Sequence, residues 1–281
     1  MILKKSLWFL LVAIMIFSTS CEDSTDVGAA PELPPLSSMV IDFDDFTNAH
    51  STSAQTKTNA QVANENWLYA RVVTGVWNIA LVSTLAVPVA SFQSAVGQQA
   101  EYLGGTKWQW AYTIDGFTSQ YSARLTGELI GNEVKWEMYV EKSGIDSFAE
   151  FLWFSGVSKT DATSGYWILN HSSAFPENML RIDWTIQNEE VGEITYTYIR
   201  ELNNDRETDL FKDSFVTYGL QAGDLDAFYD VHVYDFNVSS FVDVDIEWNR
   251  TNFNGRVMAP SYFETLDWYC WDTSGNDITC P

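Results

Sequence analysis

The chain has 281 residues, of which 46% are hydrophobic and 15% aromatic, including 12 Trp, 13 Tyr and 17 Phe. This content of large apolar side chains excludes a disordered chain and favours strands, which accommodate aromatic residues on half-buried surfaces. The 15 basic and 38 acidic residues give a formal net charge of −23. This deficit of Lys and Arg excludes nucleic acid as a partner, because binding phosphates requires clustered cations.

The first 20 residues have the organisation of a bacterial export signal. Lys4 and Lys5 provide a positive start, and residues 7–17 form an apolar run. That run is too short to cross a bilayer core as a helix, which takes about 20 apolar residues, and it has the length of a signal-peptide core. We therefore predict a signal peptide over residues 1–20.

Cys21 follows three small residues, Ser-Thr-Ser at positions 18–20. This pattern resembles the lipobox of bacterial lipoproteins. Ser18 stands where Leu is most usual, and Ser at this position is similar to the form found in Bacteroidota lipoproteins. The resemblance implies cleavage before Cys21 and attachment of a lipid to that residue, which anchors the chain to a membrane. Ordinary signal cleavage beside an incidental Cys21 is the alternative.

The residues that follow Cys21 bear on localisation and on the domain boundary. Glu22 is not the Asp that resembles an inner-membrane retention signal, so the resemblance implies the outer membrane, at its periplasmic face or at the cell surface. Three prolines and several serines lie between residues 22 and 38. They predict that residues 21–40 are the lipidated Cys and a flexible tether, and that residues 41–281 form a single β-rich domain.

Apolar residues recur at helical spacing in a segment near residues 64–99, among them Trp67, Val72 and Trp77. No charged residue lies between Arg71 and Glu101. Because Pro88 interrupts the segment, we expect a pair of buried helices that the rest of the domain covers on most sides. A second membrane anchor is the alternative, although several polar residues dilute the stretch.

From Lys107 onward, apolar and polar residues alternate with period two. The alternation is clearest in residues 107–113, 134–141, 180–187, 193–198 and 243–248. Turn-forming pairs such as Gly131-Asn132 and Asn254-Gly255 separate these segments. The pattern predicts antiparallel strands with one buried and one solvated face. We expect about ten to twelve strands in a strongly curved sheet or partly closed barrel, packed around the helical segment.

Cys270 and Cys280 are the cysteines that remain once Cys21 is assigned to the lipid. An exported protein folds in an oxidising space, so this pair predicts a disulfide that staples a C-terminal hairpin. A zinc site is the alternative, but no His lies near the pair.

Residues that could carry catalysis or bind metal form no recognisable motif. His50, His171 and His232 lie outside any known metal or nucleophile pattern, which indicates solvated or structural roles. We expect no cofactor, and a binding protein is favoured over an enzyme. A hydrolase with dispersed catalytic residues stays open, because triads assemble from distant positions.

Acidic residues gather on one strand at Asp243, Asp245 and Glu247. Residues that share a strand face stand about 6.6 Å apart, so one ion cannot contact all three without other ligands. A solvated acidic face is the favoured interpretation, and a bridging cation such as Ca²⁺ is the alternative. Asp224, Asp226 and Asp230 form a looser group.

Inward-facing aromatic residues are the candidate ligand-lining residues. They are Trp110, Trp136, Trp184, Tyr196 and Trp248. If the helical segment leaves space on the concave face, these side chains would line an apolar pocket. A packed core is the favoured interpretation of these five residues. The favoured function is non-enzymatic binding of a hydrophobic small molecule or a neighbouring envelope protein. A surface-exposed interaction or glycan-contact module is the second hypothesis.

Overall fold

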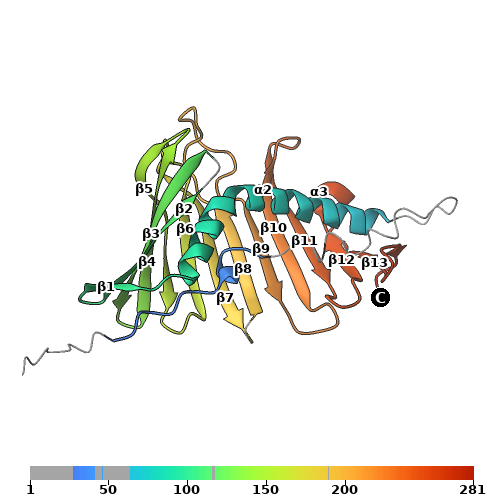
Figure 1. Ribbon diagram of the computed structural model, residues 1–281. Helices are drawn as coiled ribbons and strands as arrows, with labels where there is room; N and C mark the ends of the chain where they lie inside the picture. Colours follow the sequence, from blue (N-terminus) through green and yellow to red (C-terminus); the bar gives the residue numbers. More distant parts are fainter. Residues whose placement is uncertain (1–27, 42–45, 47–63, 116–117, 189) are drawn as a thin grey trace, which may run out of the picture.

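The computed structural model describes residues 28–41, 46, 64–115, 118–188 and 190–281 (Figure 1). The predicted signal peptide, Cys21 and His50 lie outside these residues. Within them the chain forms one antiparallel sheet of 14 strands, together with helices η1 (Leu36–Ser38), α2 (Glu65–Val96) and α3 (Pro260–Phe263).

The strands are neighbours in space in the same order as in the sequence. They are β1 (Glu101–Gly104), β2 (Lys107–Asp115), β3 (Ser119–Ile130), β4 (Glu133–Gly144), β5 (Phe148–Lys159), β6 (Ser164–Asn170), β7 (Asn178–Gln187), β8 (Glu190–Tyr198), β9 (Phe215–Leu220), β10 (Ala227–Asp235), β11 (Ser240–Trp248), β12 (Gly255–Met258), β13 (Tyr269–Trp271) and β14 (Asp277–Ile278).

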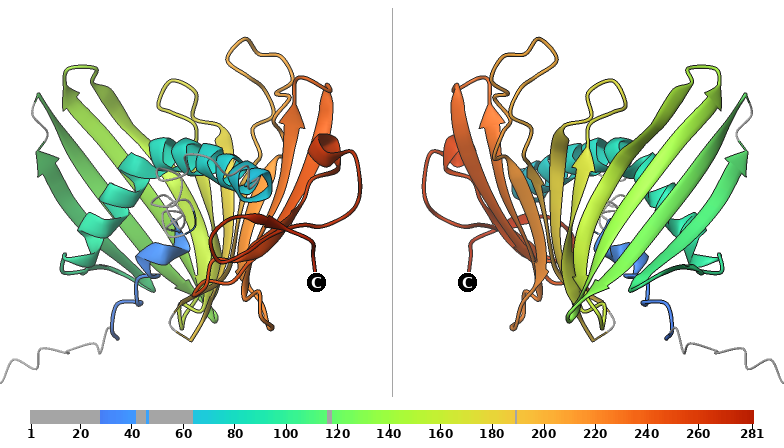
Figure 2. Two further views of the ribbon diagram at one scale, coloured as in Figure 1. Left: turned by 90° about the vertical axis from the view of Figure 1, so that its right-hand side faces the viewer. Right: turned by 90° about the vertical axis from the view of Figure 1, so that its left-hand side faces the viewer.

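The predicted fold class, a strongly curved antiparallel sheet around a helical segment, is confirmed (Figures 1 and 2). The sheet is not closed, because β1 pairs only with β2 and β14 only with β13 among the described residues. There are more strands than the expected ten to twelve. Short strands such as β1, β13 and β14 contain too few residues to produce a visible alternation.

The period-two pattern places apolar side chains on the concave face of the sheet. On β4, Val134, Trp136, Met138 and Val140 are buried, whereas the residues between them are exposed or half-buried. The same alternation runs through the other long strands, so one continuous apolar layer lines the concave side.

Glycines make room for tryptophan rings in this layer. Gly127 pairs with Trp136 and Gly156 pairs with Trp167 on neighbouring strands. A Cβ atom at Gly127 would lie 2.6 Å from the Trp136 ring, and one at Gly156 would lie 2.4 Å from the Trp167 ring. The indoles therefore lie directly over the backbone of these glycines. The side chain of any other residue at these positions would hold the rings away.

The segment before α2 also packs in the concave face. Ser38 and Met39 are fully buried. The Trp167 indole donates a hydrogen bond to Ser38 Oγ, and the Tyr196 hydroxyl donates one to the carbonyl oxygen of Met39. Residues 36–41 thus belong to the core, although composition had placed all but the last of them in the tether.

Helix α2 is one continuous helix of 32 residues, with Pro88 inside it. The expected break into two helices is wrong. Pro88 lacks the N–H that would donate back along the helix, and the ribbon bends in its second half instead of ending (Figure 1). Packing of both halves against the sheet compensates for the lost hydrogen bond.

The expectation that α2 is covered on most sides is also wrong. One stripe of the helix faces the sheet and is buried: Trp67, Ala70, Thr74, Leu81, Leu85, Pro88, Phe92 and Ala95. The opposite side is apolar yet exposed, and we call the residues Leu68, Val72, Val76, Ile79 and Val82 its outer ridge. By length and composition α2 could cross a membrane, a test that a core helix of a soluble protein also passes.

Candidate functional site

An apolar hollow in the described part of the chain lies along one side of the middle of α2, between the helix and the sheet. It has a volume of about 470 Å³, and we call it the α2 cavity. Its walls are formed by α2, β7, β8, β10 and the connection between β8 and β9. The lining residues are Val72, Val73, Val76, Trp77, Ala80, Leu81, Thr84, Met179, Leu180, Tyr198, Phe211, Ser214 and Val233.

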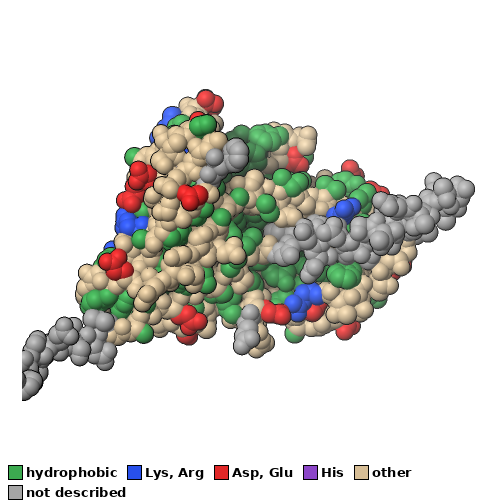
Figure 3. Space-filling model, in the orientation of Figure 1, with side chains coloured by type: hydrophobic (Ala, Val, Ile, Leu, Met, Phe, Trp, Pro, Cys, Tyr) green, Lys and Arg blue, Asp and Glu red, His purple; other side chains and the backbone are tan. Residues whose placement is uncertain are grey.

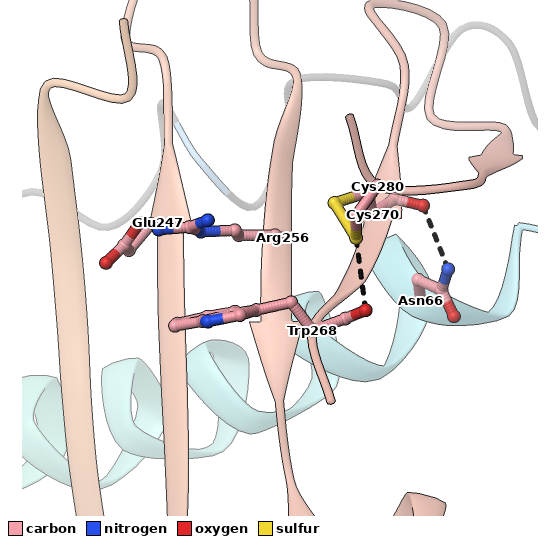
Figure 4. Close-up of a disulfide and its surroundings, with 6 residues drawn as sticks. All are labelled: Asn66, Glu247, Arg256, Trp268, Cys270 and Cys280. Atoms are coloured by element: carbon pink, nitrogen blue, oxygen red, sulfur yellow. Dashed lines mark hydrogen bonds and ion pairs between the residues drawn. A yellow bond between two sulfur atoms is a disulfide. The ribbon is translucent and has the colours of Figure 1, made fainter. Parts of the chain in front are cut away.

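The N-terminal end of α2 is held by the last strands of the sheet. The backbone N–H groups of Glu65 and Asn66 both donate to the carboxylate of Asp277, each at 3.1 Å. An acidic side chain at this position also complements the positive end of the helix dipole. The Asn66 side chain donates to the carbonyl oxygen of Cys270 at 2.9 Å, and this bond is buried (Figure 4).

Aromatic stacking strengthens this attachment. The rings of Tyr69 and Tyr262 stack with their centroids 4.1 Å apart, and Phe263 meets Tyr69 edge-on. The Tyr262 hydroxyl also donates to the Glu65 carboxylate at 2.9 Å. Residues of α3 therefore secure the first turns of α2 from a second side.

The C-terminal half of α2 is held at the other side of the sheet. Phe92 is fully buried and contacts the rings of Phe154 and Trp167 edge-on. The Tyr112 hydroxyl donates a hydrogen bond to the carbonyl oxygen of Ser91. Burial raises the pKa of Tyr112 well above its usual value, so this hydroxyl keeps its proton.

Anchored at both ends, α2 crosses the concave face as a strap (Figure 2). The α2 cavity lies along the middle of this strap. Val72 and Val76 belong both to the cavity lining and to the exposed outer ridge. The space-filling view shows hydrophobic side chains gathered over this central region (Figure 3). The cavity is thus an open groove rather than a sealed void.

The α2 cavity is suited to a neutral, apolar molecule. Its described lining contains no charged side chain, and its polar groups are the hydroxyls of Thr84, Ser214 and Tyr198 and the indole N–H of Trp77. The Tyr198 hydroxyl is engaged, since it donates to the Asp209 carboxylate at 2.9 Å. Burial, and secondarily Asp209, raise the pKa of Tyr198 to about 12, so it stays neutral at physiological pH.

The five aromatics predicted as ligand-lining residues are all buried on the concave face. None of them lines the α2 cavity. The Trp136 indole donates to Ser158 Oγ at 2.9 Å, and Trp248 stacks on Tyr229 with centroids 4.6 Å apart. Trp110 packs against Trp136, and the Trp184 indole N–H has no hydrogen-bond partner among the described residues. These side chains belong to the packed core.

The residues that do line the cavity carried a weaker signal in the sequence. The apolar positions of α2 are spread around the whole helix, so the pattern did not distinguish Val72 and Val76 from the sheet-facing stripe. The strand residues Met179, Tyr198 and Val233 lie near strand ends. These three residues come together only because the start of β7, the end of β8 and the end of β10 lie at the same end of the sheet, which the sequence does not reveal.

The predicted disulfide between Cys270 and Cys280 is present, with Cα atoms 5.2 Å apart (Figure 4). The carbonyl oxygen of Trp268 lies 3.0 Å from Cys280 Sγ. Arg256 stacks over the Trp268 ring at 4.3 Å and pairs with Glu247 on β11. The staple therefore fixes the sheet edge to which α2 is attached.

The acidic group on β11 is divided among separate partners. Glu247 pairs with Arg256, and Asp243 lies 2.6 Å from His232 Nδ1. Asp245 stands directly across from Asp230 on β10. Within the described ranges, no three His, Cys, Asp or Glu side chains are grouped so that they could hold a metal ion.

The two described histidines, His171 and His232, make local contacts. His232 lies on the convex side and stacks on Phe241 with centroids 4.6 Å apart. His171 follows β6 and contacts Ser172 at 3.1 Å, and burial lowers its pKa. Neither ring lies in the lining of the α2 cavity.

Comparison of the chain with protein-family models, curated proteins and solved structures finds no match.

Proposed function

We propose that this protein is a lipid-anchored binding protein of the bacterial outer membrane that holds a neutral, apolar small molecule in the α2 cavity. The observation that carries the proposal is the 470 Å³ apolar groove along the middle of a strap that is anchored at both ends. The lipobox-like sequence before Cys21 supports the membrane attachment.

The dimensions and chemistry of the groove support this function. Ligand pockets commonly measure about 300–1,000 Å³ and are lined mainly by apolar side chains with a few polar groups. Apolar cavities of about 150 Å³ already stay dry and bind small hydrocarbons. An ionised ligand would lose its hydration without gaining a charged partner, so a neutral molecule is favoured.

Two substitutions on the same helix test the proposal. Ala80→Trp places an indole in the cavity, whereas Ala90→Trp adds the same group at an exposed position of α2 outside the lining. The full chain and both variants are purified from their native membrane, extracted with organic solvent and examined by mass spectrometry. We expect the same apolar compound from the unsubstituted chain and Ala90→Trp, and its depletion from Ala80→Trp.

Equal recovery from the two variants would contradict ligand binding in the α2 cavity. Thermal unfolding of both variants provides the control for stability, because a destabilised Ala80→Trp chain would lose ligand for another reason. If Ala80→Trp unfolds at the lower temperature, the smaller Ala80→Leu replaces it in the same comparison.

A further inference from the structure

The two ends of the sheet differ in the chemistry of their connections. Because the strands form an antiparallel meander, alternate connections lie at the same end. The connections after β1, β3, β5, β7, β9, β11 and β13 are built mainly from Gly, Asn, Asp, Thr and Ser. The connections after β4, β8, β10 and β12 lie at the opposite end, which is uppermost in Figure 1.

Six connections between described strands lie at this end of the sheet. The connection between β6 and β7, residues 171–177 of the described chain, carries no exposed large apolar side chain, whereas the four connections after β4, β8, β10 and β12 all carry exposed apolar side chains. We call them the loop rim: Ile145, Leu210, Phe211, Phe236, Val238 and Leu266. The rings of Phe211 and Phe236 contact each other edge-on with their centroids 5.3 Å apart, and the rim as a whole is drawn from four separate connections. Solvent-exposed loop tips are normally polar, and a group of large apolar residues at one end indicates a contact surface.

The loop rim is continuous with the mouth of the α2 cavity. Phe211 belongs to the rim and also lines the cavity. The other lining residues outside α2 lie near the same end: Met179 and Leu180 begin β7, and Tyr198 ends β8. A molecule leaving the cavity past Phe211 would therefore meet the loop rim first.

The geometry points to a zwitterionic lipid bilayer as the occupant of this surface. We infer that the loop rim inserts into the bilayer interface and that the apolar ligand passes between bilayer and cavity at Phe211. This inference rests on the proposed ligand-binding function. A fluid bilayer can accept separate apolar tips along a curved edge, whereas a protein partner needs one contiguous complementary patch.

The charges beside the rim decide which bilayer is favoured. Acidic residues outnumber basic ones in the connections that carry the rim, with Asp146, Asp213 and Glu264 among them. Anionic lipid surfaces attract basic segments and repel acidic ones. Phosphatidylcholine vesicles are therefore the appropriate probe, and vesicles rich in phosphatidylglycerol are expected to engage the rim more weakly.

Matched isoleucines at the two ends make the test specific. Ile145 on the β4–β5 hairpin is 60% exposed, and Ile130 at the opposite end is 55% exposed. Single variants Ile145→Cys, Phe236→Cys and Ile130→Cys are prepared in the full chain and labelled with the environment-sensitive fluorophore NBD. The unsubstituted chain carried through the same labelling gives the background. Each sample is reconstituted with phosphatidylcholine vesicles whose acyl chains are brominated, and quenching is measured.

We expect loss of most of the NBD fluorescence at positions 145 and 236 and of little at position 130. Adding Phe236→Asp should markedly reduce the quenching at position 145, whereas adding Ile130→Asp should leave it unchanged. Equal quenching at both ends, or none at the rim, would overturn the inference. A signal that follows protein concentration instead of brominated lipid would make the rim an interface between two copies and would also overturn it.

The same samples separate this inference from the proposed function. Ligand depletion in Ala80→Trp without quenching at the rim would leave ligand binding intact and overturn the bilayer contact. Quenching at the rim with equal ligand recovery from Ala80→Trp and Ala90→Trp would support the bilayer contact and contradict the function of the cavity.

Discussion

Asn66 joins the first turn of the α2 strap to the disulfide-bearing strand, because its side-chain amide donates a buried 2.9 Å hydrogen bond to the carbonyl oxygen of Cys270. The disulfide to Cys280 fixes the same strand at the sheet edge (Figure 4). The strap along the cavity and the C-terminal staple are therefore parts of one structural unit.

Removing the disulfide should weaken this unit. We expect Cys270→Ser with Cys280→Ser to lower the free energy of unfolding by about 2–3 kcal/mol, because the short loop regains entropy in the unfolded chain. Denaturant unfolding at neutral pH measures the change. Asn66→Ala, which removes the hydrogen bond and keeps the disulfide, should cost about 1–3 kcal/mol, since it leaves the Cys270 carbonyl without this donor. An unchanged midpoint in the double Ser variant would contradict the structural role of the staple.

The paired carboxyls of Asp230 and Asp245 should make stability depend on pH. Burial is the main cause that raises both pKa values above 3.8. Repulsion by Asp243 adds to it at Asp230, and repulsion by Asp230, Asp243 and Glu247 adds to it at Asp245. Between 3.8 and the raised values the folded chain binds more protons than the unfolded one, so their contribution to stability falls as pH rises through this window.

Asp245→Asn should therefore stabilise the protein at pH 7, by on the order of 1 kcal/mol or less after solvent screening. The gain should disappear as the pH falls below about 3.8, the ordinary pKa of an Asp carboxyl. Thermal unfolding across this range measures it. Asp224→Asn is the control, because it removes an exposed acid in the connection between β9 and β10 and should bring no comparable gain. Destabilisation by Asp245→Asn at pH 7 would refute the repulsion.

Gly127 should tolerate no side chain. A Cβ atom there would lie 2.6 Å from the ring of Trp136, which is fully buried and cannot move aside. Gly127→Ala is expected to destabilise the fold by about 1–3 kcal/mol through overpacking. Gly75→Ala on α2 is the matched control, since nothing lies within 4 Å of its added Cβ, and it should stabilise by about 0.5–1 kcal/mol. Equal effects of the two substitutions in denaturant unfolding would contradict this packing.

Cys21 should carry the lipid implied by its lipobox-like sequence. In cells supplied with radiolabelled palmitate, we expect the label in the unsubstituted chain and its loss in Cys21→Ala. Cys270→Ala with Cys280→Ala is the control and should retain the label. Labelling that persists in Cys21→Ala would refute the anchor.

The sequence predicted the β-rich part of the fold well because its signals are local. The alternation of apolar residues such as Val134, Trp136 and Met138 with polar ones indicates which face of a strand is buried. This signal does not depend on which strands are its neighbours. The Cys270–Cys280 disulfide could also be predicted from the sequence, because the two residues are close in sequence and Cys21 was already assigned to the lipid.

The helix and the cavity were predicted less well because they depend on packing at a distance. Pro88 weakens a helix locally, but contacts on both sides, such as Leu85 and Phe92 against the sheet, keep α2 continuous. An aromatic residue that faces inward can line a pocket or fill a core, and Trp136 and Trp248 proved to be core.

By itself, the sequence determined the strands, their buried faces, the position of the helical segment and the disulfide. Only the tertiary structure decided that α2 is a strap with an exposed outer ridge, that a cavity lies along its middle, and that the apolar loops share one end. The physical reason is that side-chain periodicity is set by the backbone geometry of each element, whereas a cavity exists only where distant elements fail to fill the space between them.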